Sequence, residues 1–109
     1  MPALNLIEAI NLALHSEMRR DASVVALGQD IGRNGGVHRA TVGLLEAFGE
    51  DRVIDMPLAE TLIAGMAIGL ATQGYRPVAE IQSSGFLYPC AEQIAHHAAR
   101  LRHRTQGRL

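Results

Sequence analysis

Three short apolar segments alternate with helical stretches along this chain, and that alternation constrains the fold more than any other feature. The segments Val24–Leu27, Arg52–Met56 and Pro77–Gln82 are bounded by glycine, proline or polar turn residues, which is typical of buried strands. Strands that alternate with helices form βαβ units with right-handed crossovers. We therefore expect an α/β fold, a parallel sheet with helices on both faces.

The helical stretches show the spacing and the stop signals of helices. Apolar residues recur every three or four positions between Leu4 and Arg20 and mark one face of an amphipathic helix. Further helices are expected at Leu44–Phe48, at Glu60–Thr72 and from about Leu87 to Arg104. The alternation predicts another strand after the last helix. Residues 1–109 are therefore expected to be a single domain that is incomplete at its C-terminus.

Composition narrows the classes of function. The net charge is −1, so electrostatics favours neither nucleic acid nor an anionic membrane as a partner. The single cysteine, Cys90, rules out an internal disulfide and suits a reducing compartment, where it is expected as a small core residue. The longest apolar run, Leu62–Ala71, is shorter than the roughly 20 residues that span a bilayer. We expect a soluble, cytoplasmic protein.

The glycine-rich segment 28–43 and the histidines near the C-terminus are weaker signals. The segment contains neither G-x-G-x-x-G nor a G-K-[ST] ending, so turns with positive φ are favoured over a phosphate-binding loop. His96, His97 and His103 lack the i, i+4 spacing of a helical metal pair. We expect no metal site in this chain.

One carboxylate is placed where an α/β fold binds ligands. Glu60 follows the second strand and lies in the first turn of the next helix. Met56, Leu58, Leu62 and Ile63 flank it, and apolar surroundings disfavour the charged form of a carboxylate, which can then hold a proton near neutral pH. Acidic residues are also common in a first turn because they complement the helix dipole. Position alone leaves both interpretations open.

The helix that begins at Glu60 is unusually rich in small residues. Its sequence contains Ala64, Gly65, Ala67, Gly69 and Ala71. Small residues let another helix or a sheet approach closely. Packing against the protein's own sheet and packing against another subunit are equally compatible with this pattern.

Three long stretches resemble a known family. They are LGQDIGRNGGVHRATVGLLEAFGEDRVIDMPLAE, ETLIAGMAIGLATQGYRPVAEIQ and FLYPCAEQIAHHAARLRHRTQGRL. In this order, over nearly the whole chain, they resemble the start of the beta subunit of thiamine diphosphate-dependent 2-oxo acid dehydrogenases, the decarboxylating components of the pyruvate, branched-chain 2-oxo acid and acetoin dehydrogenase complexes. The resemblance implies a transketolase-like pyrimidine-binding domain. Another transketolase-like thiamine enzyme stays an alternative.

The resemblance implies roles for four residues. Glu60 matches the glutamate that protonates the aminopyrimidine ring nitrogen of thiamine diphosphate, which activates the thiazolium carbon. Phe86 matches the aromatic residue that stacks on the pyrimidine, and Leu58 and Gln82 match positions that line its pocket. The diphosphate and its magnesium are held by the alpha subunit in this family. A second beta subunit and the dihydrolipoyl acyltransferase core are the other implied partners.

Two departures from the family pattern limit the implied function. Gln29 stands where a glutamate is usual, and in the family that carboxylate is associated with an acidic path between two active sites. A glutamine cannot carry the charge. Family beta subunits are also much longer, so the rest of the pyrimidine domain, a second catalytic histidine and a C-terminal domain have no counterpart here. The competing expectation is a non-catalytic, truncated fragment that at most pairs with other subunits.

Overall fold

Strand β1 (Val24–Gln29) lies at the centre of a three-stranded parallel sheet in the computed structural model, which describes residues 3–109. Strands β2 (Val53–Met56) and β3 (Arg76–Glu80) flank it, so the strand order is β2-β1-β3. Both pairings are parallel, and Ala26 of β1 is in register with one residue of each neighbour. The parallel sheet expected from the sequence is confirmed.

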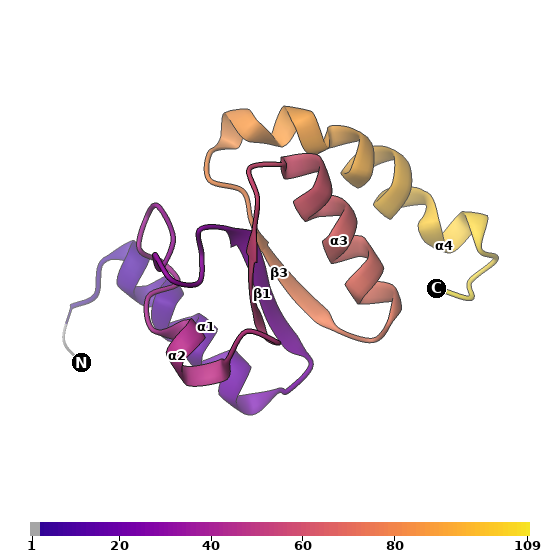
Figure 1. Cartoon of the computed structure of the whole chain (residues 1–109). Coiled ribbons are helices and arrows are strands. Elements are labelled where there is room, and N and C mark those ends of the chain that lie inside the picture. The colour runs from indigo at the N-terminus through magenta and orange to yellow at the C-terminus, as the bar shows by residue number, and fades with distance from the viewer. Residues whose placement is uncertain (1–2) are drawn as a thin grey trace.

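Helices α1 (Leu6–Arg20) and α2 (Leu44–Phe48) cover one face of this sheet (Figure 1). Helix α1 begins with a capping box in which Asn5 and Glu8 each bond the other's backbone N–H at 2.9 Å. The core between these helices and the sheet contains Met18, Val24, Ala26, Ile31, Leu44 and Val53. Burial of this apolar cluster fixes the first layer of the fold.

Helix α3 (Glu60–Thr72) covers the opposite face (Figure 1), so helices lie on both faces as expected. A second core forms here from Leu27, Met56 and Ile63. Although α3 is apolar on all sides, only Ile63 and Ala64 are buried, and the side chain of Leu62 is 49% exposed. The helix therefore leaves apolar surface uncovered within this chain.

The C-terminal helical segment is irregular, and the single helix expected from Leu87 to Arg104 is wrong. The segment consists of a 3₁₀ helix η1 (Ser84–Cys90), a π-helix η2 (Glu92–His97), a short 3₁₀ helix η3 (Ala98–Arg100) and helix α4 (Leu101–Arg104). Pro89 lies inside η1 and has no N–H to donate, which breaks the regular ladder of hydrogen bonds. A π turn then accommodates the shifted bonds. The segment runs alongside α3 (Figure 1).

Two strand ends also differ from expectation. Strand β1 extends to Gln29, whereas β3 ends at Glu80. Gln82 therefore lies just beyond the last strand, where the chain turns towards η1. No helix within residues 3–109 is long and apolar enough to cross a membrane.

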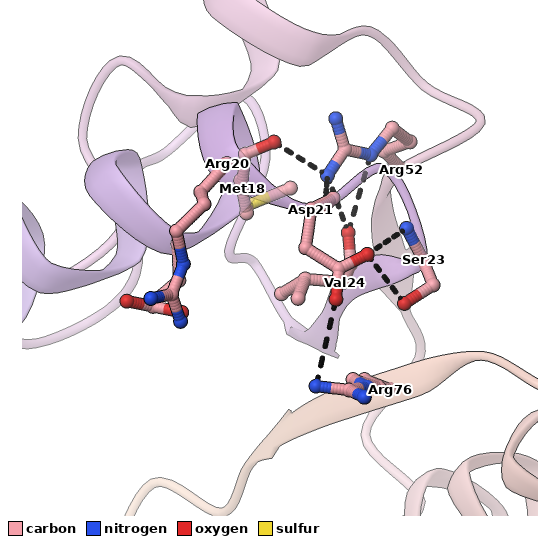
Figure 2. A network of polar contacts seen from close by, with 8 residues as sticks. Met18, Arg20, Asp21, Ser23, Val24, Arg52 and Arg76 are labelled. Atoms are coloured by element: carbon pink, nitrogen blue, oxygen red, sulfur yellow. Dashed lines mark hydrogen bonds and ion pairs between the residues drawn. The ribbon is translucent and has the colours of Figure 1, made fainter.

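The Arg52 side chain bonds backbone carbonyl groups near the amino ends of the strands (Figure 2). Its guanidinium donates hydrogen bonds of 2.7–2.9 Å to the carbonyl oxygens of Met18, Asp21 and Val24. It also lies over the ring of Phe48, 5.1 Å from the ring centroid, which is a favourable cation–π distance. One side chain thus joins the end of α1, the start of β1 and α2.

Asp21 adds a second set of polar contacts at this end of the sheet (Figure 2). Its carboxylate accepts hydrogen bonds from both the backbone N–H and the hydroxyl of Ser23, and it faces Arg76 of β3 at 3.6 Å. The bonds from Ser23, with Arg76 and Arg20 nearby, lower the pKa of the Asp21 carboxyl. This network fixes the sheet at the end opposite the predicted site.

Candidate functional site

The carboxyl ends of the three strands meet at one edge, where α/β folds bind ligands. Gln29 at the end of β1 is in register with Met56 at the end of β2. The Gln82 side chain reaches the same place from β3 and donates a long hydrogen bond of 3.4 Å to the carbonyl oxygen of Gln29. The chain leaves β2 through Leu58 and enters α3 at Glu60. This edge therefore carries three of the four predicted site residues.

Phe86 is brought to the same edge through helix η1. The hydroxyl of Thr61, the residue after Glu60, donates a 2.7 Å hydrogen bond to the carbonyl oxygen of Pro89. Cys90 is fully buried, and its thiol donates to the carbonyl oxygen of Leu87 at 3.2 Å. Cys90 is thus a small core residue, as expected. These contacts place the helix that carries Phe86 beside the first turn of α3.

The apolar residues that flank Glu60 in the sequence differ in their burial, which corrects part of the expectation that its surroundings are apolar. Met56 and Ile63 are buried, and Glu60 itself is half-buried. Leu58 is 72% exposed, and Phe86 is 47% exposed. Leu58 and Phe86 therefore leave apolar surface exposed within this chain.

The glycine-rich loop after β1 is built around a carboxylate of the protein itself. Asp55 accepts hydrogen bonds from the N–H groups of Gly32 at 2.7 Å and Arg33 at 3.3 Å. A Cβ atom on Gly32 would lie 2.6 Å from an oxygen of Asp55, so a larger residue there would displace the carboxylate. Gly35 and Gly36 take positive φ, in agreement with the turn interpretation. The N–H groups of Gly32 and Arg33 thus bond a carboxylate of the protein itself.

Two polar residues at this edge were not predicted as site residues. Nε2 of His38 lies 2.8 Å from the carbonyl oxygen of Gln82. Burial raises the pKa of Glu80, and the charge of His38 opposes part of that rise. The Oε1 atom of Glu80 is buried without a hydrogen-bond partner within the described chain. Asp55 is a third such residue, and its position near the carboxyl end of β2 was the signal available for it, whereas His38 is isolated in the sequence.

The C-terminal histidines make pairwise contacts with their neighbours. His96 lies 3.0 Å from Arg104, and His97 lies 3.7 Å from Glu92. Across residues 3–109, no three His, Cys, Asp or Glu side chains gather as a group that would hold a metal ion. The four predicted site residues are one carboxylate, one amide and two apolar side chains, and further polar side chains lie beside them.

The chain belongs to the family described as "Transketolase, pyrimidine binding domain", which matches residues 3–107. It is 52% identical to the 2-oxoisovalerate dehydrogenase subunit beta of Bacillus subtilis over 107 residues, which cover 98% of this chain and 33% of that protein. It is 51% identical to the pyruvate dehydrogenase E1 component subunit beta of Staphylococcus epidermidis over the same shares of both chains. The pyruvate dehydrogenase E1 component subunit beta of Bacillus subtilis is 49% identical over 108 residues. The chain spans about a third of the length of these relatives. The family resemblance expected from the sequence is confirmed.

Proposed function

We propose that this chain supplies the pyrimidine-binding side of a thiamine diphosphate site in the decarboxylating component of a 2-oxo acid dehydrogenase. The observation that carries the proposal is the position of Glu60. It is the first residue of α3 at the carboxyl edge of the sheet, in a chain whose family match covers residues 3–107. The relatives that bear the names of beta subunits support the reaction class.

Each predicted residue has a role that its chemistry suits. Glu60, half-buried at the start of α3, exchanges a proton with the aminopyrimidine ring nitrogen. Phe86 offers an exposed aromatic face on which a flat ring can stack. Leu58 and Gln82 complete the lining. When bound, thiamine diphosphate supplies the nucleophilic carbon that attacks the 2-oxo acid.

The other half of the site belongs to partners in this proposal. Because the edge is open around Leu58 and Phe86, a partner alpha subunit covers it and holds the diphosphate and magnesium. The exposed apolar surface of α3 suits contact with a second beta subunit. The complete assembly docks on a dihydrolipoyl acyltransferase core in the cytoplasm. Residues 1–109 are one part of the pyrimidine-binding domain in this arrangement.

The experiment that tests the proposal is Glu60→Gln in the subunit assembled with its alpha partner. Glutamine keeps the size and the hydrogen-bonding capacity of glutamate but cannot exchange a proton. Cofactor binding is therefore expected to persist while decarboxylation falls by about a hundredfold to ten-thousandfold. Steady-state kinetics with cofactor titration measures both quantities.

A matched control distinguishes proton transfer from a simple helix-end charge. Glu46 is also an acidic residue in the first turn of a helix, α2, and it is exposed. Glu46→Gln is expected to leave turnover unchanged. If Glu60→Gln keeps turnover within a few-fold of wild type, Glu60 is only a helix-end charge. A wild-type subunit that binds the alpha partner but shows no decarboxylation would favour the non-catalytic alternative.

A further inference from the structure

The loop between β1 and α2, residues 30–43, is bonded to both outer strands at the candidate site. On the β2 side, Asp55 accepts from the backbone N–H groups of Gly32 and Arg33. On the β3 side, Nε2 of His38 lies 2.8 Å from the carbonyl oxygen of Gln82. Because β1 lies between β2 and β3, this one loop spans the ends of all three strands.

The two strand ends that the loop joins lead into the two parts of the proposed cofactor pocket. The chain after Asp55 carries Leu58 and Glu60, and the chain that contains Gln82 continues to Phe86. The loop therefore contacts the segments that lead to the acid–base residue and to the stacking residue.

The chemistry of the contact fixes the tautomer of His38. A carbonyl oxygen can only accept a hydrogen bond. The Nε2 atom of His38 must therefore carry the hydrogen that points at Gln82.

Glu80 is the charged group that faces His38 across the neighbouring cavity. This cavity, about 360 Å³, lies between α1, β1, the loop and β3, and His38 and Glu80 are the titratable residues among those that line it. The α1 side contributes the apolar residues Ile7, Ile10 and Leu14. A Cβ atom on Gly36 of the loop would lie 3.5 Å from Oε2 of Glu80. The loop thus passes close to this carboxylate on its way to His38.

We propose that His38 is a positioning residue, whose hydrogen bond to the backbone of Gln82 holds the part of the pocket that carries Gln82 and Phe86. The proposal rests on the proposed function, because it assigns His38 its effect through cofactor binding. His38 itself touches no reacting group. Its loss frees the backbone at Gln82, where the segment to Phe86 begins, and leaves the bond from Asp55 to the loop and the bond from Thr61 to Pro89 in place.

The test compares His38→Phe and His38→Gln in the subunit assembled with its alpha partner, with thiamine diphosphate as the titrated probe. His38→Phe keeps a ring but removes the donor, and is expected to weaken cofactor binding by about three- to tenfold. The turnover at saturating cofactor is expected to change by less than about twofold. His38→Gln retains a side-chain N–H and is expected to recover most of the affinity.

His15 of α1 offers a matched control, because it contacts the same loop. Its Nε2 atom lies 3.1 Å from the carbonyl oxygen of Val42, so it also bonds a loop carbonyl, but from α1 and away from Gln82. His15→Phe is expected to leave the cofactor affinity unchanged. If His15→Phe weakens binding as much as His38→Phe, the effect comes from general loosening of the loop and the positioning role is overturned.

A second measurement needs no cofactor. Nitrogen-15 NMR of the 109-residue chain reports which ring nitrogen of His38 carries the proton, and the Nε2–H tautomer is expected. The Nδ1–H tautomer would overturn the proposal. If wild-type protein binds thiamine diphosphate and His38→Phe binds it equally well, the positioning role fails while the proposed function stands. If the wild-type assembly does not bind the cofactor, the proposed function fails and the positioning role fails with it.

Discussion

The hydroxyl of Thr61 donates a 2.7 Å hydrogen bond to the carbonyl oxygen of Pro89, which joins the first turn of α3 to helix η1. Pro89 interrupts the regular helical bonding of η1. A side chain from α3 thus satisfies a carbonyl oxygen in the irregular helix. This bond connects the residue next to Glu60 with the helix that carries Phe86.

Loss of the Thr61–Pro89 hydrogen bond is expected to weaken the contact between α3 and η1. Thr61→Val keeps the shape of the side chain but removes the hydroxyl, so the free energy of unfolding is expected to fall by about 1 kcal/mol. Thr72→Val is the control, because the Thr72 hydroxyl bonds only local groups, the carbonyl oxygen of Gly69 and the side chain of Gln73. Urea denaturation of the 109-residue chain measures both variants. Equal effects in the two variants would contradict the special role of the Thr61–Pro89 bond.

Arg52 is expected to be the largest single polar contribution to stability. Arg52→Met leaves the carbonyl oxygens of Met18, Asp21 and Val24 without their charged donor. The expected loss is roughly 2–4 kcal/mol in the free energy of unfolding. Arg52→Lys restores the charge but not the forked donors, and is expected to recover only part of it. A loss in Arg52→Met no greater than in a variant of exposed Arg100 would refute this expectation.

Glu80 is expected to make stability fall as pH rises. Burial raises the pKa of this carboxyl above its ordinary value of 4.5, so the folded state keeps its proton at pH values where the unfolded state has lost it. Folding therefore becomes less favourable from the ordinary pKa up through the raised one and is constant above it. Glu80→Gln removes this loss of stability. The free energy of unfolding of the variant therefore rises relative to that of wild type as pH increases from the ordinary pKa to the raised pKa.

Denaturation curves at a series of pH values check this sign. At each pH, the free energy of unfolding of wild type is subtracted from that of Glu80→Gln. The subtraction removes the contributions of the other titratable groups. His38→Phe is expected to raise the pKa of Glu80 further, because the charge of His38 opposes the effect of burial. Carbon-13 NMR of the carboxyl group follows that shift. A lowered Glu80 pKa in His38→Phe would show that the two groups do not interact as described.

Phe86 is expected to contribute to cofactor binding more than to turnover. Phe86→Ala removes the stacking surface, so thiamine diphosphate affinity in the assembled enzyme is expected to fall by about tenfold, with a smaller change in turnover. Tyr88 is a suitable control, because it lies on the same helix and is 84% exposed. Tyr88→Ala is expected to bind the cofactor like wild type, as measured by fluorescence titration. Identical losses would indicate a general effect on η1.

Local pattern was sufficient to predict the sheet and most helices. The apolar runs around Val24, Val53 and Val78 form three parallel strands, although the edge strand β3 has no buried residue within this chain. The helix from Glu60 to Thr72 was predicted to the residue. Pro89 is visible in the sequence, but the π turn that follows it depends on packing against α3, which spacing along the chain does not contain.

The candidate site was only partly predictable for a similar reason. Glu60 could be placed from its position after a strand, and Leu58, Gln82 and Phe86 from the family resemblance. The bonds from Asp55 to Gly32 and from His38 to Gln82 join residues far apart in the sequence. No periodicity in the sequence indicates contacts between residues so far apart. These bonds form only when the strand order β2-β1-β3 brings the loop after β1 beside both β2 and β3.

The central position of β1 also has a consequence for how the chain acquires its structure. Ala26 is in register with both Val53 and Val78, so the first strand to leave the ribosome has two partners that are synthesised later. Each pairing must close a long stretch of chain, and such non-local contacts form slowly. Until β3 arrives, one edge of β1 is a row of unpaired backbone groups open to any other extended segment. A nascent chain of this design therefore passes through an aggregation-sensitive stage, which chaperones that shield exposed strand edges would shorten.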